Sequence, residues 1–132
     1  MSYPSITAVL EERHVDLDTA THAELEGALL EAFRRDLPDG MSYLNAVAAR
    51  VRQTGQRLLQ PEDPNSPLGK QLIRLLGTDV ARGIVEREFG TGFAFGLYNC
   101  CGVVAAPTRE ALAMNMREQI LLQNGVLASA DC

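Results

Sequence analysis

The uncharged stretch GTGFAFGLYNCCGVVAAP, residues 90–107, decides how the fold of this chain is interpreted. It contains four glycines and sets Cys100 and Cys101 side by side. Large and small side chains alternate through GFAFGL with the period of two that is typical of a strand. Glycines at this density also weaken a helix by about 1 kcal/mol each. We therefore favour a strand-like segment over about residues 90–106, although small residues at spacing four would also form one face of a helix.

A strand in this stretch needs a partner strand. The candidates are GVLA, residues 125–128, and the same stretch of a second copy of the chain. In the second case the large side chains would form an interface between subunits through Phe93, Phe95, Leu97 and Val103. This hypothesis predicts self-association or a protein partner.

The same stretch raises the question of a membrane span or a cofactor loop. Its uncharged length matches the roughly 20 residues of a transmembrane helix. Tyr98, Asn99 and the glycines make it too polar for that role, so we expect no membrane association.

Gly90-Thr91-Gly92 begins like a dinucleotide-binding loop, but Phe95 stands in place of the third glycine. We expect no cofactor.

The cysteines allow two interpretations. Neighbouring Cα atoms are about 3.8 Å apart, below the usual disulfide range of about 4.4–6.8 Å, so Cys100 and Cys101 do not suit a bridge. Their neighbours are apolar or small, which favours buried, inert thiols in a reducing compartment. The alternative is a thiol site at Cys100 and Cys101, with Cys132 as an exposed third thiol.

A polar cluster near the N-terminus has the spacing of a metal site. His14, Asp18 and His22 recur every four residues, which on a continuous helix could bring imidazole and carboxylate groups to one ion. The residues from Asp18 to Thr21 look like a helix cap, which would interrupt that helix. Solvated polar positions are therefore the favoured interpretation.

The rest of the chain predicts helices. One follows Ser5, and a second begins at a capping box formed by Thr21 and Glu24 and ends before the turn signal LPDG, residues 37–40. A third, amphipathic helix is expected from Ser42 through residue 59, until Pro61 stops it.

Further helix signals follow the proline-rich connector. Ser66-Pro67 is typical of a cap followed by the first helical position. That helix should run to Gly77 and restart at Thr78 or Asp79, and a last one should begin after Thr108. We therefore predict a single domain, residues 1–132, that is mainly α, with four to five helices and the uncharged segment.

Composition and charge bear on function. The chain has 132 residues, a net charge of −5 and a pI near 5.0, which argues against nucleic-acid binding. The N-terminus lacks a signal peptide, so a cytoplasmic location is expected. No catalytic motif is present, which favours a non-enzymatic role. We expect a structural or adaptor subunit of a homo-oligomeric or multiprotein assembly; the alternative is a small-molecule-binding or thiol-responsive protein that uses Cys100 and Cys101.

Overall fold

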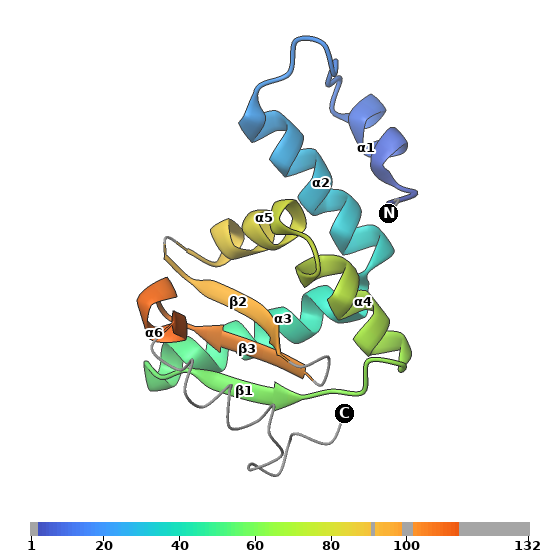
Figure 1. Cartoon of the computed structure of the whole chain (residues 1–132). Helices are drawn as coiled ribbons and strands as arrows, with labels where there is room; N and C mark the ends of the chain where they lie inside the picture. The colour runs from blue at the N-terminus through green and yellow to red at the C-terminus, as the bar shows by residue number, and fades with distance from the viewer. Residues whose placement is uncertain (1–2, 91, 99–101, 114–132) are drawn as a thin grey trace.

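The protein is mainly helical and carries a small antiparallel sheet (Figure 1). The computed structural model describes residues 3–90, 92–98 and 102–113. Its helices are α1 (Ile6–Glu12), α2 (His22–Asp36), α3 (Pro38–Thr54), α4 (Pro67–Leu76), α5 (Asp79–Phe89) and α6 (Arg109–Ala113). Its strands are β1 (Leu58–Pro61), β2 (Ala94–Tyr98) and β3 (Gly102–Ala106). The prediction of a mainly α chain is confirmed, and a three-stranded sheet accompanies the helices.

Local capping signals set the starts of three helices. The Thr21 hydroxyl accepts the Glu24 N–H at 3.2 Å, and the Glu24 carboxylate accepts the Thr21 N–H at 3.2 Å, so the predicted capping box of α2 is present. Ser66 and Thr78 likewise accept the N–H of the third residue of α4 and α5, at 2.9 and 3.2 Å. The predicted starts of these three helices are confirmed. They could be predicted because each cap lies close in sequence to the N–H group that it satisfies.

Both predicted ends of the third helix are wrong. The helix α3 begins at Pro38 rather than Ser42, because proline suits the first helical position and the Gln71 side chain accepts the Gly40 N–H at 2.8 Å. At its other end, Gly55 has a φ of 69° and terminates α3. The leucines expected to extend this helix therefore belong to β1.

The uncharged stretch forms two strands of one sheet. The sheet order is β1-β3-β2, and both pairings are antiparallel. The strand-like prediction is thus confirmed, but the partner strand comes from the same stretch: Phe95 of β2 lies opposite Ala105 of β3. The alternative partner, residues 125–128, lies outside the described residues.

Each outer strand of the sheet has one backbone position closed to further pairing. The Phe95 N–H donates to the Glu86 carboxylate at 2.8 Å and so points away from β3. On the other side, Pro61 of β1 lies opposite Gly102. Because Gly102 bonds toward β2, this position needs no N–H from β1, and a proline is tolerated there.

Helices α3, α4 and α5 cover one face of the sheet. These helices, the sheet and the C-terminal part of α2 share one hydrophobic core. Its largest fully buried side chains include Phe33, Leu44, Leu72, Leu75 and Phe95. None of the helices in the described part of the chain has both the length and the apolar character needed to cross a membrane.

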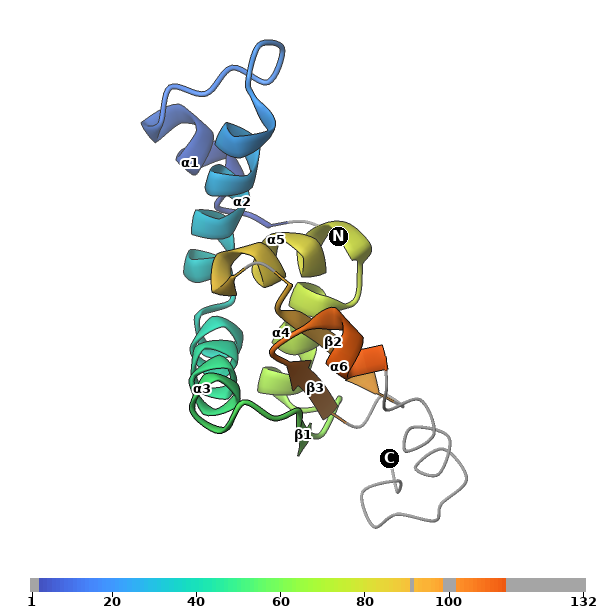
Figure 2. The same ribbon diagram turned by 90° about the vertical axis from the view of Figure 1, so that its left-hand side faces the viewer.

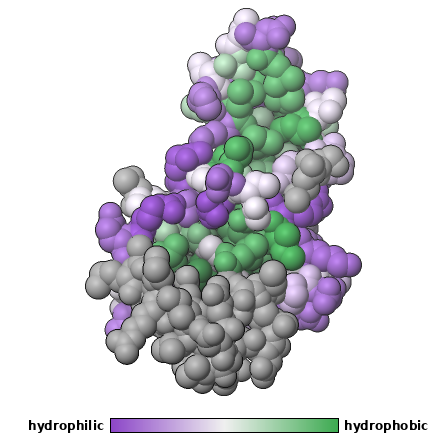
Figure 3. All heavy atoms as spheres, viewed as in Figure 1, coloured by the Kyte–Doolittle hydropathy of each residue, from purple (hydrophilic) through white to green (hydrophobic). Residues whose placement is uncertain are grey.

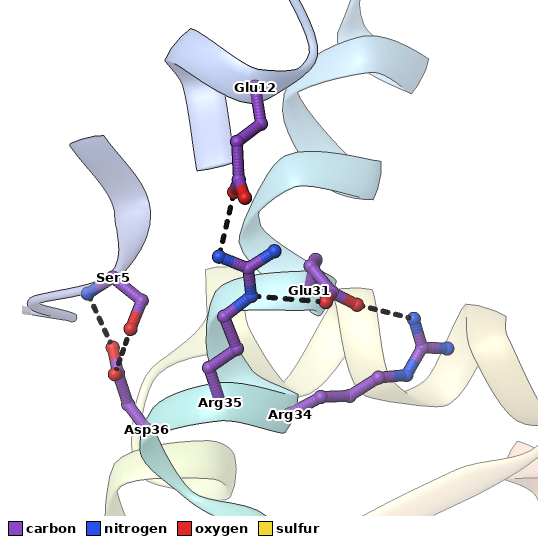
Figure 4. A network of polar contacts seen from close by, with 6 residues as sticks. All are labelled: Ser5, Glu12, Glu31, Arg34, Arg35 and Asp36. Carbon is purple, nitrogen blue, oxygen red and sulfur yellow. Dashed lines mark hydrogen bonds and ion pairs between the residues drawn. The ribbon is translucent and has the colours of Figure 1, made fainter. Parts of the chain in front are cut away.

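The α1–α2 hairpin projects from the body formed by the other helices and the sheet (Figure 2). Polar contacts fasten its two helices (Figure 4): the Ser5 N–H and hydroxyl both donate to Asp36, and Arg35 bridges Glu12 at 2.7 Å and Glu31 at 3.2 Å. The hydrogen bonds that Arg35 donates to Glu12 and, with a smaller effect, to Glu31 raise the pKa of Arg35. Figure 3 shows that hydrophobic side chains also gather over this hairpin.

Tyr3 links the start of the chain to α4. Its hydroxyl donates to the Arg74 carbonyl oxygen at 3.0 Å, and its ring lies 4.8 Å from that of Phe33. The Arg74 guanidinium lies over the Tyr3 ring, 5.3 Å from its centroid. Burial raises the pKa of Tyr3, and the positive charge of Arg74 partly offsets this rise. The last turn of α4 is therefore held from the side of the N-terminal hairpin.

Candidate functional site

An apolar groove lies between α4 and β2. It encloses a cavity of about 150 Å³, and its lining consists of Glu62, Pro64, Gly69, Leu72, Ile73, Leu97, Gly102 and Val103. We call it the α4–β2 groove. Hydrophobic clefts with a few polar groups at the rim are the usual form of a ligand site.

Two exposed apolar side chains line this groove. Ile73 and Leu97 remain 38% and 36% exposed on its two walls. Val80, which is 70% exposed, lies in the first turn of α5, directly after α4. Leu17 is the other strongly exposed large hydrophobic residue of the described chain, and it lies on the connector between α1 and α2. Exposed apolar side chains that lie close together, such as Ile73 and Leu97, indicate an interaction site.

The turn between α4 and α5 is tight and carries a carboxylate. A side chain at Gly77 would place its Cβ 2.5 Å from the Ile73 carbonyl oxygen, so the turn requires glycine. Thr78 caps α5, and Asp79 occupies its first position and pairs with Arg82. A helix N-terminus attracts anions through its free N–H groups, and the Asp79 carboxylate already supplies negative charge there.

The edge of β2 adds hydrogen-bonding groups to the groove. Because the Phe95 N–H points away from β3, the N–H and C=O of Leu97, two residues along, point the same way. Within the described ranges no side chain or backbone group bonds to them from that side. Leu97 therefore offers one donor and one acceptor next to its own apolar side chain.

Charge is distributed unevenly along the chain. Residues 1–37 hold eight carboxylates and three arginines, whereas residues 38–132 hold nine carboxylates and nine basic side chains. The whole excess of five negative charges thus belongs to the segment of the α1–α2 hairpin, and the segment that carries the groove is neutral. On α4, Lys70 is exposed and forms no ion pair with any residue that the structure describes.

The predicted interface residues do not form a surface. Phe93, Phe95 and Val103 are 6%, 1% and 1% exposed and belong to the core of the chain itself. Three of the four residues are therefore unavailable to a second subunit. Leu97 alone is exposed, and it lines the α4–β2 groove.

The other predicted site residues are not brought together either. His14 and Asp18 are exposed on the connector after α1, where His14 has a φ of 54°, and His22 begins α2. Among the residues with described positions, no group of three or more His, Cys, Asp or Glu side chains could hold a metal ion. The thiol candidates Cys100, Cys101 and Cys132 lie outside the described residues.

Sequence reasoning missed the groove. Ile73 lies in the helix predicted between Ser66 and Gly77, but the pattern of a helix alone does not say which apolar residue stays exposed. The alternation of large and small residues predicts Leu97 at a subunit interface. Only the approach of α4 to β2 joins these two residues in one site.

Comparison with known proteins identifies the family. A family model of the KH type, described as NucS shadow ORF, matches residues 10–132. Since the match covers nearly the whole chain, the chain belongs to this family. No curated protein and no solved structure matches it significantly.

The family corrects two predictions. KH modules recognise nucleic acid, so the exclusion of nucleic-acid partners is wrong, and so is the prediction of a structural or adaptor subunit with its thiol alternative. The exclusion rested on the net charge of the whole chain. That charge averages an acidic N-terminal segment with a neutral remainder, and it therefore says little about the surface at the groove.

Proposed function

We propose that this protein binds single-stranded nucleic acid in the α4–β2 groove. The observation that carries the proposal is an exposed apolar groove, bordered by an open strand edge, in a chain of a KH-type family. Unpaired bases have apolar faces and hydrogen-bonding edges, and a site for them needs both kinds of contact.

The groove supplies both kinds of contact. Ile73 and Leu97 offer apolar surface on opposite walls, against which the face of a base can be buried. The free N–H and C=O of Leu97 can bond to the edge of that base. A duplex does not expose its bases in this way, so the expected ligand is single-stranded RNA or DNA.

The chain departs from the KH pattern at the phosphate clamp. KH modules hold the nucleic-acid backbone with a G-x-x-G loop, and no G-x-x-G occurs anywhere in this sequence. The turn after α4 reads Gly77-Thr78-Asp79-Val80, in which a carboxylate precedes the place of the second glycine. Binding through this groove therefore depends on base contacts, with Lys70 as the nearby cation on α4.

Fluorescence anisotropy with labelled single strands tests the proposal. Oligonucleotides of about eight nucleotides, twice the four that a KH loop clamps, would span the groove. Ile73→Gln and Leu97→Thr keep helix and strand preferences while removing apolar surface. Each should weaken binding at least about fivefold, which corresponds to roughly 1 kcal/mol of lost apolar burial. Leu17→Gln removes an exposed leucine far along the hairpin and should leave binding unchanged.

Two results would contradict the proposal. One is the absence of binding by the wild-type protein at about 100 µM, the weak end of non-specific association. The other is an equal loss of affinity in Leu17→Gln and Ile73→Gln, which would show that binding does not use the groove.

A further inference from the structure

A second depression lies at the C-terminal end of α5. Its volume is about 320 Å³, and its lining consists of Gly83, Glu86, Arg87, Gly90, Gly92, Phe93 and Arg109. It shares no lining residue with the α4–β2 groove. In Figure 1 the helices that carry its charged side chains, α5 and α6, lie at the end of the sheet where β2 begins.

Two guanidinium groups from different helices reach this depression. The side chains of Arg87 on α5 and Arg109 on α6 are 60% and 59% exposed. Arg87 donates through Nε and Nη2 to Glu26, and Arg109 donates through Nη2 to Glu86. A guanidinium has five N–H donors, so each arginine keeps donors for a ligand.

The carboxylate in the depression is already fully engaged. Glu86 is buried, with 8% of its side chain exposed. Its Oε2 accepts the Phe95 N–H and its Oε1 accepts Arg109. The second carboxylate, Glu26, holds Arg87 from outside the lining, so Glu86 is the one carboxylate on the wall of the depression.

A third arginine and three glycines add to this environment. Arg52 of α3 lies 5.6 Å from the ring of Phe93 and donates to the Phe89 carbonyl oxygen. The glycines of the lining leave the depression without side chains that would fill it. A Cβ at Gly83 would already meet the Arg87 guanidinium at 3.2 Å.

We propose that this depression binds a phosphate group between Arg87 and Arg109. A carboxylate is planar and matches one guanidinium fork, whereas a tetrahedral phosphate presents oxygens in several directions and can bond to two forks at once. The two arginines approach from different helices, which suits the tetrahedral anion. The site does not depend on nucleic-acid binding at the groove.

The test uses inorganic phosphate and the whole chain of 132 residues. Resonances of the arginine Nε–H groups in ¹H–¹⁵N spectra should shift at Arg87 and Arg109 as phosphate is added at constant ionic strength. Arg87→Gln should raise the dissociation constant at least about tenfold, the value of one lost charge-assisted hydrogen bond. Arg109→Gln should do the same if it folds, and Arg87→Gln carries the test if it does not. Arg50→Gln, an exposed arginine of α3, is the matched control.

A second titration identifies the source of the phosphate. Single strands with a 5′-phosphate and with a 5′-hydroxyl are compared in the Ile73→Gln variant. Tighter binding of the phosphorylated strand indicates a nucleic-acid terminus, and equal binding indicates a free phosphate or a small phosphate ester. The proposal is overturned if phosphate shifts neither arginine more than an equal ionic strength of sodium chloride does, or if Arg87→Gln binds as tightly as Arg50→Gln.

Discussion

The Glu86 carboxylate of α5 accepts the backbone N–H of Phe95 in β2 at 2.8 Å. This contact joins a helix directly to the edge of the sheet, and its acceptor also holds Arg109 at the start of α6. A buried carboxylate is stable only when it is paired and hydrogen-bonded, and Glu86 has both kinds of partner.

The first prediction concerns this contact. Glu86→Ala should lower the free energy of unfolding by about 1–3 kcal/mol, because the Phe95 N–H would lose its acceptor in a buried position. Glu86→Gln keeps an oxygen acceptor and should cost less. The measurement is chemical denaturation followed by circular dichroism.

A neighbouring carboxylate supplies the control. Glu88 on the same helix pairs with Arg34 at 2.9 Å and is exposed, so Glu88→Ala should change stability by no more than about 0.5 kcal/mol. Similar losses in Glu86→Ala and Glu88→Ala would show that the contact with Phe95 does not stabilise the sheet.

The second prediction concerns alkaline pH. Burial raises the pKa of Tyr3 above its ordinary value of 10.0, so the native state binds this proton more tightly than the unfolded state does. Its contribution to stability is complete below pH 10 and is lost as the pH rises through the higher native pKa. Urea denaturation across this range should show the loss in the wild-type protein and a smaller loss in Tyr3→Phe, which has no proton to release. Identical pH profiles would contradict the prediction.

The third prediction concerns salt. Lys70 on α4 has no ion-pair partner among the described residues, and the sequence contains no G-x-x-G loop, so few phosphates should be neutralised at the groove. The logarithm of the binding constant for a single strand should then fall with the logarithm of salt concentration at a slope near −0.7, the value for one contact.

Lys70→Gln should bring that slope close to zero, while Arg50→Gln should not change it. A wild-type slope steeper than about −3 would mean that the strand runs over several basic side chains elsewhere on the protein.

The fourth prediction concerns the packing of β3 against β1. A Cβ at Gly102 would lie 2.2 Å from the Gln60 carbonyl oxygen, a backbone atom that cannot move without disturbing the ladder. Gly102→Ala should therefore destabilise the protein by about 1–3 kcal/mol.

A second glycine of the sheet is the matched control. A Cβ at Gly96 would meet a side-chain carbon of Val104 at 3.2 Å, so Gly96→Ala requires a much smaller shift. In thermal denaturation, the midpoint temperature of Gly102→Ala should lie well below that of Gly96→Ala. The reverse order would contradict the pairing of β1 with β3.

The elements predicted correctly are those whose signals are local. A cap such as Thr21 or Ser66 satisfies N–H groups within three residues, so its pattern is visible in the sequence. The alternation in GFAFGL is likewise a local property, and it indicated β2. These predictions required no knowledge of the rest of the fold.

The elements predicted wrongly depend on distant partners. Leu58 and Leu59 continue a helical stripe, but they pair with Ala105 and Val104, more than forty residues away. The turn signal at Pro38-Asp39-Gly40 became the first turn of α3, where Gln71 of α4 supplies the missing acceptor. The functional groove has the same character, since its walls come from α4 and β2.

The two outer strands of the sheet differ from ordinary open edges. On β1, Pro61 offers no N–H to a neighbouring chain. Leu59 is then the one residue of β1 whose N–H and C=O both point outward without a partner among the described residues. On β2, the Glu86 carboxylate occupies the N–H of Phe95. A foreign strand would thus find no continuous run of donors and acceptors on either side. These two positions make the edges poor templates for a strand of another copy, and the shortness of the strands has the same effect.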